Sequence, residues 1–226
     1  MFSAAVCSHT SRWKQAVALA GQLGCRTTMD NGSLGSTRNH ARAWSEALTL
    51  SSDAAEWVAV VEDDAIPVPN IRAEMDAILA QSPAPIVSGY LGTGRPPQYQ
   101  PLIRGALSAD PAWVIADELL HHVAVFVQRK HVPGLIAFLE AHPNHPCDEA
   151  ISIWACNNRL PVAYPIPSPF DHADTPPVIR DEDRVQPIRE ARVAWQHGTR
   201  PDWSGGRIAL LDQKTKNRYG HMFGGR

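Results

Sequence analysis

The chain of 226 residues has 44% hydrophobic and 19% charged residues, a composition that excludes a disordered chain and is typical of a globular protein. Its length favours one α/β domain with a substantial buried core. The formal net charge of −2 hides an asymmetry, because six basic and two acidic residues give residues 197–226 a charge of +4 and leave −6 on the remainder. Such a basic end, which also carries aromatic residues, could meet phosphates or nucleic acid, or simply be a solvated segment.

The apolar stretches are too short to span a membrane. None approaches the ~20 residues that a spanning helix needs. The apolar N-terminal residues lack the basic leader of a signal peptide. We therefore expect a cytoplasmic protein with no membrane partner.

The cysteines show no CxxC spacing, which argues against a zinc site or a redox motif. We expect them to be buried thiols that behave as small apolar side chains. They are Cys7, Cys25, Cys147 and Cys156.

The first part of the chain alternates between predicted strands and helices. Short apolar runs at 2–8, 57–61 and 86–90 are typical of buried strands, and a brief extended piece is expected near 26–29. Apolar residues at helical spacing predict helices at 13–23, 36–48 and 71–79. This order predicts a largely parallel sheet with helices on its faces.

The second part is less regular. Residues 91–113 are rich in Gly, Pro and Gln, and we expect a long loop there with at most one short strand. Further on, the pattern predicts strands at 123–127 and 161–166, helices at 132–141 and 147–159, and a proline-rich loop at 167–177. We find no internal repeat and no boundary of a second domain.

The acidic triplet Glu62-Asp63-Asp64 is the best single functional signal. It directly follows the clearest buried strand, and the ends of parallel strands are where α/β proteins bind ligands. Three consecutive carboxylates repel one another unless a cation or solvent relieves them. A hard divalent ion such as Mg²⁺ or Mn²⁺ suits such a site and can bridge to diphosphate oxygens. The alternative is a solvated turn or helix start that merely tolerates acids.

Two later segments carry further candidates. His172 follows the last predicted strand in a proline-rich loop and could complete a metal shell, with Asp171 or Asp174 orienting its ring. Asp148 and Glu149 open a predicted helix, where one of them could act as a general base or both could simply favour the helix dipole. The glycines at 32 and 35 match neither a dinucleotide-binding nor a P-loop motif. The pair His121-His122 is a weaker candidate for lining a pocket.

Taken together, these motifs resemble those of GT-A glycosyltransferases. The segments that carry the resemblance are VCSHTSR (6–12), STRNHARAW (36–44), VAVVEDDA (58–65), CDEAISIWA (147–155) and PSPFDH (167–172). The acidic motif is similar to that of several GT-A families, and its combination with the later segments looks most like small bacteriophage glycosyltransferases. The resemblance covers 1–178 and implies a single Rossmann-like GT-A domain with a mostly parallel central sheet and helices on both faces. Residues 179–226 would be a basic extension packed on or next to it.

The resemblance also implies roles for individual residues. Mn²⁺ or Mg²⁺ would be held by Asp64, Glu62 and His172. A nucleotide-sugar donor, expected to be a UDP-sugar, would be bound by Ser8, His9, Thr10, Ser36, Asn39, Glu62 and Asp63. Asp148 would be the base of an inverting displacement, with Glu149 as the close alternative. Because the first acid of the motif is Glu62 rather than Asp, it stays open which of the three acids would bind the metal and which would contact the donor.

The acceptor is not specified by these motifs. The phage-type resemblance implies either 5-hydroxymethylcytosine in phage DNA, which would have to be flipped or exposed, or a virion protein or glycan. The basic tail and the arginines at 95–104 favour double-stranded DNA carrying hydroxymethylated bases, which would place the enzyme in the host cell cytoplasm. Two other classes of protein remain as alternatives. One is a metal-dependent nucleotide-sugar hydrolase or phosphoryl-transfer enzyme. The other is an inactive binding module, but such a protein would need neither the acidic triplet nor a general base.

Overall fold

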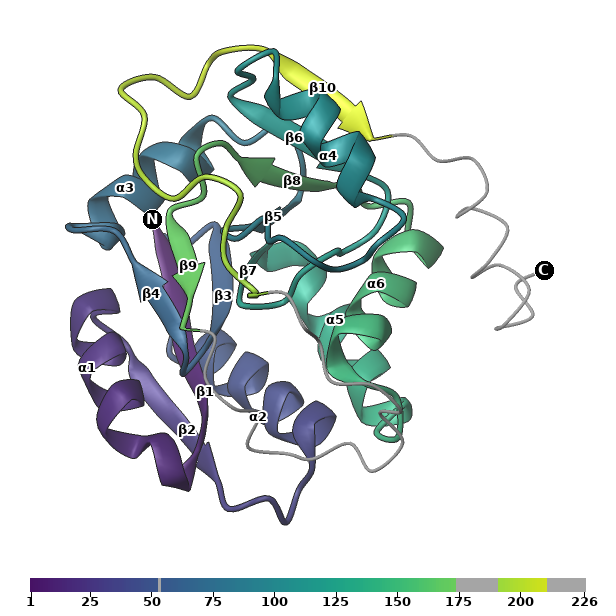
Figure 1. Cartoon of the computed structure of the whole chain (residues 1–226). Helices are drawn as coiled ribbons and strands as arrows, with labels where there is room; N and C mark the ends of the chain where they lie inside the picture. The colour runs from purple at the N-terminus through teal and green to yellow at the C-terminus, as the bar shows by residue number, and fades with distance from the viewer. Residues whose placement is uncertain (53, 174–190, 211–226) are drawn as a thin grey trace.

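A computed structural model describes residues 1–52, 54–173 and 191–210 (Figure 1). Its strands are β1 (Phe2–His9), β2 (Arg26–Asp30), β3 (Trp57–Glu62), β4 (Ala65–Pro67), β5 (Ile86–Ser88), β6 (Trp113–Ala116), β7 (Ala124–Gln128), β8 (Val162–Pro165), β9 (Phe170–His172) and β10 (Arg207–Leu210). Its helices are α1 (Trp13–Leu23), α2 (Ser36–Thr49), α3 (Ile71–Ala80), α4 (Gln100–Leu107), α5 (Val132–Ala141) and α6 (Cys147–Asn157), with 3₁₀ turns at Thr10–Arg12 and Arg129–His131.

Eight of these strands form one central sheet in the order β10-β6-β8-β5-β7-β3-β1-β2. The sheet is mostly parallel: β1 pairs in parallel with β2 and β3, β5 with β8, and β6 with β10. Strand β7 runs antiparallel to β3 and β5, and β6 runs antiparallel to β8. Strands β4 and β9 form a separate antiparallel pair beside the sheet. The architecture is α/β and consistent with a Rossmann-like fold.

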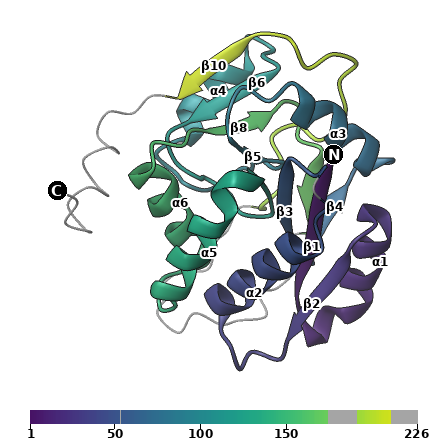
Figure 2. The ribbon, with the colours of Figure 1, turned by 180° about the vertical axis from the view of Figure 1, so that it is seen from behind.

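Helices cover both faces of the sheet, as predicted. Successive side chains of a strand point to opposite faces, so the alternation in β1 and β3 divides the core into two layers. Ala5 and Val60 pack in the layer that contains α2, α4, α5 and α6. Val6 and Val61 pack in the layer that contains α1 and α3. Figure 2, which views the molecule from behind, shows α2, α5 and α6 on the near side of the sheet.

The first three strands create the place where a ligand can bind. The chain crosses from β1 to β2 through α1 on one face and from β2 to β3 through α2 on the other, while β1 lies between β2 and β3. The chain therefore leaves β1 and β2 toward opposite faces of the sheet, and a cleft lies at the carboxyl ends of β1 and β3. His9 ends β1 and Glu62 ends β3, so the acidic triplet lies at this cleft.

The prediction of a loop at 91–113 was wrong in its middle, where the structure has the helix α4. A proline in its first turn suits a helix start, because that backbone N–H has no partner within the helix. Ile103 and Ala106 lie three residues apart and are buried against the core. The helix has only two turns and contains Gly105, so its periodicity was too short to detect.

The expected proline-rich loop at 167–177 contains β9, so that prediction was also incomplete. Strand β9 pairs with β4 in the register Ala65↔His172 and Pro67↔Phe170. A pair of three-residue strands leaves almost no periodic signal in the sequence. The pairing follows from contacts across the chain rather than from local pattern.

Residues 191–210, within the expected C-terminal extension, join the same sheet through β10. The Trp203 side chain is buried against Trp113, whose Nε1 donates a hydrogen bond of 2.7 Å to the Trp203 carbonyl. Arg200 donates to the carbonyls of Pro111 and Ile166. Four of the six basic residues of the tail (Lys214, Lys216, Arg218 and Arg226) lie outside the described residues. Within the described ranges, no helix is both long and apolar enough to cross a membrane.

The neighbours Ile103 and Leu102 allow α4 to be tested. Ile103 is fully buried and Leu102 is 44% exposed. We expect Ile103→Ala to lower the free energy of unfolding by about 2–5 kcal/mol, because it leaves a cavity in the core. Leu102→Ala should change it by about 0.5 kcal/mol or less. Urea unfolding of both variants checks this, and equal effects would mean that α4 does not pack as described.

Candidate functional site

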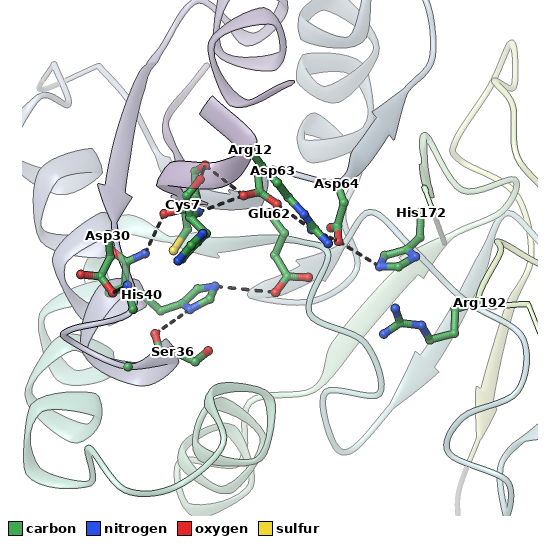
Figure 3. Close-up of a pocket in the computed structure, with 15 residues that line it drawn as sticks. Cys7, Arg12, Asp30, Ser36, His40, Glu62, Asp63, Asp64, His172 and Arg192 are labelled. Carbon is green, nitrogen blue, oxygen red and sulfur yellow. Dashed lines mark hydrogen bonds and ion pairs between the residues drawn. The ribbon is translucent and has the colours of Figure 1, made fainter. Parts of the chain in front are cut away.

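The acidic triplet lies in a cleft at the carboxyl ends of β1 and β3 (Figure 3). The cleft has a volume of about 230 Å³. It is lined by residues of the first strands and helices together with two from later in the chain. These residues are Cys7, Ser8, His9, Arg12, Asp30, Gly32, Gly35, Ser36, Asn39, His40, Glu62, Asp63, Asp64, His172 and Arg192.

Asp63 uses its carboxylate to hold the end of β1. Its Oδ2 accepts hydrogen bonds from the Ser8 hydroxyl at 2.9 Å and from the His9 backbone N–H at 3.0 Å. Its Oδ1 accepts from Arg12 at 3.0 Å. Asp63 and Ser8 are both buried. Asp63 therefore positions the loop after β1, and both its oxygens are engaged within the protein.

Asp64 is paired with His172, and these are two of the three residues that the resemblance implies as metal ligands. The β4–β9 pairing brings them together, with His172 Nε2 3.4 Å from Asp64 Oδ2. Arg12 donates to the same oxygen at 2.7 Å. Burial alone would raise the pKa of Asp64, but His172 and Arg12 outweigh it and lower this pKa to about 2.

The Asp64–His172 pair has buried donor atoms that no protein group uses, in addition to the Oδ2 and Nε2 atoms that face each other. Asp64 Oδ1 and His172 Nδ1 are buried and have no hydrogen-bond partner. A buried polar atom without a partner is costly, and a bound cation would remove that cost. Oxygen from Asp64 and nitrogen from His172 are suitable ligands for Mn²⁺, and the oxygen also for Mg²⁺. These two residues fit the predicted metal.

Glu62, the third predicted ligand, turns in a different direction. Its Oε1 lies 3.3 Å from His122 Nδ1 and 3.9 Å from His40 Nε2. Figure 3 shows its side chain directed toward His40, while Asp64 faces His172. The pKa of Glu62 is lowered because His122 outweighs the effect of burial. The structure thus groups Asp64 with His172 and leaves Glu62 with a separate pair of histidines.

A second, larger cleft adjoins the first. It has a volume of about 570 Å³ and shares Ser36, Glu62, His172 and Arg192 with the first cleft, among other residues. Asp148 lies exposed at the start of α6 and lines this second cleft. The structure therefore separates the two candidate bases, because Glu149 is exposed but does not line either of these clefts.

The remaining predicted donor-binding residues are divided. His9, Ser36 and Asn39 line the first cleft, where the Asn39 side-chain amide donates to the Ser8 carbonyl at 3.2 Å. Thr10 is exposed in the 3₁₀ turn after β1 and does not line it.

The predicted orientation of the His172 ring by Asp171 was wrong. The Asp171 carboxylate accepts instead from the backbone N–H groups of His172 and Ala194, at 2.8 and 2.7 Å. It therefore anchors the returning chain at 194 to β9. Asp174, the other residue considered for this role, lies outside the described residues.

Sequence reasoning missed several residues of the site. Arg12 lies in the quoted segment VCSHTSR but has no distinctive spacing to the triplet, 51 residues later. Arg192 lines both clefts but comes from beyond the region of resemblance. His40 and Cys147 meet His122 beside Glu62, although the missing CxxC spacing argued against such a cluster.

The buried thiols were expected as apolar side chains, but Cys147 lies in a polar environment. Burial would raise the pKa of Cys147, yet His40 and His122 lower it to about 7. In turn, Cys147 helps to raise the pKa of His122 to about 10 against the effect of burial. Cys7 is also buried, while Cys25 and Cys156 are half-buried.

Comparison with models of known protein families and with curated proteins gave no match. The interpretation of the site therefore depends on its geometry and chemistry.

The low pKa of Asp64 predicts a pH-dependent contribution to stability. A carboxylate with a lowered pKa stabilises the fold above its unfolded value near 3.8, and this stabilisation is lost as the pH falls toward 2. We expect the stability difference between wild type and Asp64→Asn to shrink by about 2 kcal/mol between pH 5 and pH 2. Urea unfolding across this range measures it. Asp110→Asn, an exposed carboxylate paired with Arg200, is the matched control, and parallel curves for wild type and Asp64→Asn would contradict the expectation.

Proposed function

We propose that the protein is a metal-dependent GT-A glycosyltransferase that moves a sugar from a nucleotide diphosphate donor, a UDP-sugar, to a hydroxyl acceptor. The observation that carries this proposal is the buried Asp64–His172 pair at the carboxyl edge of the sheet, with His172 Nε2 3.4 Å from Asp64 Oδ2. Parallel α/β sheets bind nucleotides at such a crevice. The resemblance of the motifs supports the same activity.

The first cleft has the groups that a nucleotide diphosphate requires. Asp64 and His172 would hold Mn²⁺ or Mg²⁺, which when bound supplies positive charge beside the diphosphate. Arg192 lines the cleft and offers a guanidinium, a good partner for phosphate oxygens. His9 and Ser36 line the part of the cleft near β1 and α2, where they would contact the base or ribose.

Asp148 is the proposed general base, because it lines the adjoining cleft where an acceptor would enter. The acceptor hydroxyl would lose its proton to the Asp148 carboxylate while its oxygen bonds to the anomeric carbon of the sugar. The bond from that carbon to the phosphate oxygen breaks, and the nucleoside diphosphate leaves. A base opposite the leaving group inverts the configuration at the anomeric carbon.

The lining of the second cleft suggests the acceptor. We propose that the acceptor is 5-hydroxymethylcytosine in double-stranded phage DNA, and that the enzyme modifies this DNA in the host cytoplasm. The cleft is lined by Tyr90 and His121, which are in contact with each other, and by Arg95. Aromatic rings and arginine side chains are typical partners of a flipped base. The basic tail could meet the DNA backbone. A virion protein, a glycan or water would be the alternative acceptor.

Donor turnover tests the transferase and its acceptor together. The purified protein is incubated with Mn²⁺ and a panel of nucleotide sugars, with and without hydroxymethylcytosine DNA, and nucleoside diphosphate release is measured. We expect release that requires the metal, one donor and the modified DNA. We expect Asp64→Asn to lower turnover at least about 100-fold, because preorganised charge at the leaving group is a large part of catalysis.

A loss of less than about tenfold in Asp64→Asn, or ~1.4 kcal/mol in the barrier, would contradict the proposal. Release of free sugar without any acceptor would favour the hydrolase. Transfer to a protein or glycan but not to DNA would keep the enzyme class and change the acceptor.

The two acids at the start of α6 provide a matched pair. We expect Asp148→Asn to lower transfer at least about 100-fold and leave donor binding within about twofold, because a base acts only on the acceptor. Glu149→Gln, next in the chain and equally exposed, should retain transfer within about twofold. Calorimetry of donor binding and turnover assays separate the two effects. The reverse pattern would identify Glu149 as the base.

A further inference from the structure

Three side chains with metal-binding chemistry meet beside Glu62. His40 from α2, His122 from the segment before β7 and Cys147 from the start of α6 each offer one ligand atom. These atoms all lie within 4.8 Å of one another, and all three residues are buried. The cluster lies between the two clefts, since His40 lines the first and the other two line the second.

The His40 ring is held through one nitrogen, and the other nitrogen makes no hydrogen bond although it lies 3.9 Å from Glu62 Oε1. Its Nδ1 lies 2.9 Å from the carbonyl of Ser36, a pure acceptor, so Nδ1 carries the hydrogen and donates. Nε2 can then bind a metal ion through its lone pair, once the ion displaces the proton on that nitrogen. This Nε2 is buried without a hydrogen-bond partner, in a side chain only 6% exposed. Metal-binding histidines are commonly fixed by such a bond from the other nitrogen to a carbonyl.

The orientation of the His122 ring is also fixed through its Nδ1, in this case by a carboxylate. Its Nδ1 lies 3.3 Å from Glu62 Oε1, and its Nε2 lies 3.6 Å from Cys147 Sγ. A zinc ion bound tetrahedrally by sulfur and nitrogen separates these two ligand atoms by about 3.5 Å, given ordinary zinc–ligand distances. The Nε2–Sγ distance therefore matches one edge of such a site, and the carboxylate holds the ring in place.

Cys147 is placed where a thiolate is favoured. It is the first residue of the eleven-residue helix α6, whose N-terminal dipole stabilises negative charge. The nearby histidines lower the pKa of this thiol to about 7. A metal ion that binds His122 would displace a proton from its ring, because a histidine ligand must be deprotonated at the nitrogen that binds the metal.

We propose that His40, His122 and Cys147 form a second metal site, which takes Zn²⁺ and is distinct from the Asp64–His172 site. Thiolate and imidazole ligands select zinc over Mg²⁺ and Mn²⁺, which prefer oxygen. Three protein ligands leave a fourth position for water or a ligand from the clefts. A metal ion at this cluster would bind His40 Nε2, which makes no hydrogen bond and lies 3.9 Å from Glu62 Oε1. This inference goes beyond the proposed function and does not depend on it.

Cobalt serves as the spectroscopic probe of the site. The full chain is stripped with a chelator and titrated with Co²⁺ at neutral pH, in the absence of any nucleotide sugar. We expect one equivalent to produce the thiolate-to-cobalt absorption and the intense visible bands of a tetrahedral site, and Zn²⁺ to abolish both. Cobalt binding without the thiolate absorption, or no binding, would overturn the proposal.

Matched variants locate the ligands. Cys147→Ser should remove the thiolate absorption, and His40→Gln should weaken Zn²⁺ binding at least about tenfold in competition with a chromophoric chelator. Cys156→Ser, on the same helix, should change neither. Asp64→Asn should also keep the absorption, so a failure of the proposed transferase and a failure of this site are distinguishable. An absorption that survives in Cys147→Ser would overturn the assignment.

A measurement on the wild type avoids the risk that a variant does not fold. One equivalent of Zn²⁺ should slow alkylation of Cys147 at least about tenfold relative to Cys25, as followed by mass spectrometry of peptides. Equal protection of both thiols, or of neither, would contradict a zinc site at Cys147.

Discussion

The structure around the clefts depends on one electrostatic constraint: three consecutive carboxylates at the end of a buried strand must each be compensated by cations or hydrogen-bond donors. Each acid of the triplet turns to different partners. Glu62 meets the histidines at 40 and 122, Asp63 holds the end of β1, and Asp64 meets His172. Arg12 bridges the second and third acids, which lessens their mutual repulsion.

This division organises elements that are distant in the sequence. The partners of the triplet come from the turn before α1, from α2, from the segment before β7 and from β9. Each contact fixes one of these elements relative to the end of β3. The same arrangement separates the Asp64–His172 site from the histidine–cysteine cluster, with Glu62 between them. Two groups of potential metal ligands, one of oxygen and nitrogen and one of nitrogen and sulfur, thus adjoin one acidic turn.

The sequence predicted what depends on local pattern. Strand β3 and its acids were recognisable because a buried apolar run led directly into the triplet, and α6 because Ile151 and Trp154 lie on one inward face. What depended on distant contacts was not predicted. Strand β10 pairs with a strand about ninety residues earlier, and Cys147 meets His122 only through the packing of α6. No local periodicity records such contacts. The pairing of Asp64 with His172 was anticipated only through a resemblance, because no spacing connects them.

The edge of the sheet formed by β6 and β10 has a consequence for the order in which the chain can fold. The tryptophans at 113 and 203 are in contact across 90 residues, and β10 covers the outer edge of β6. During synthesis on the ribosome, β6 leaves the exit tunnel long before this cover exists. The β1–β3 unit and its acidic turn can pair early, whereas the far edge must wait for β10, about ninety residues after β6. A nascent chain paused before Trp203 would therefore leave the edge of β6 without the cover of β10.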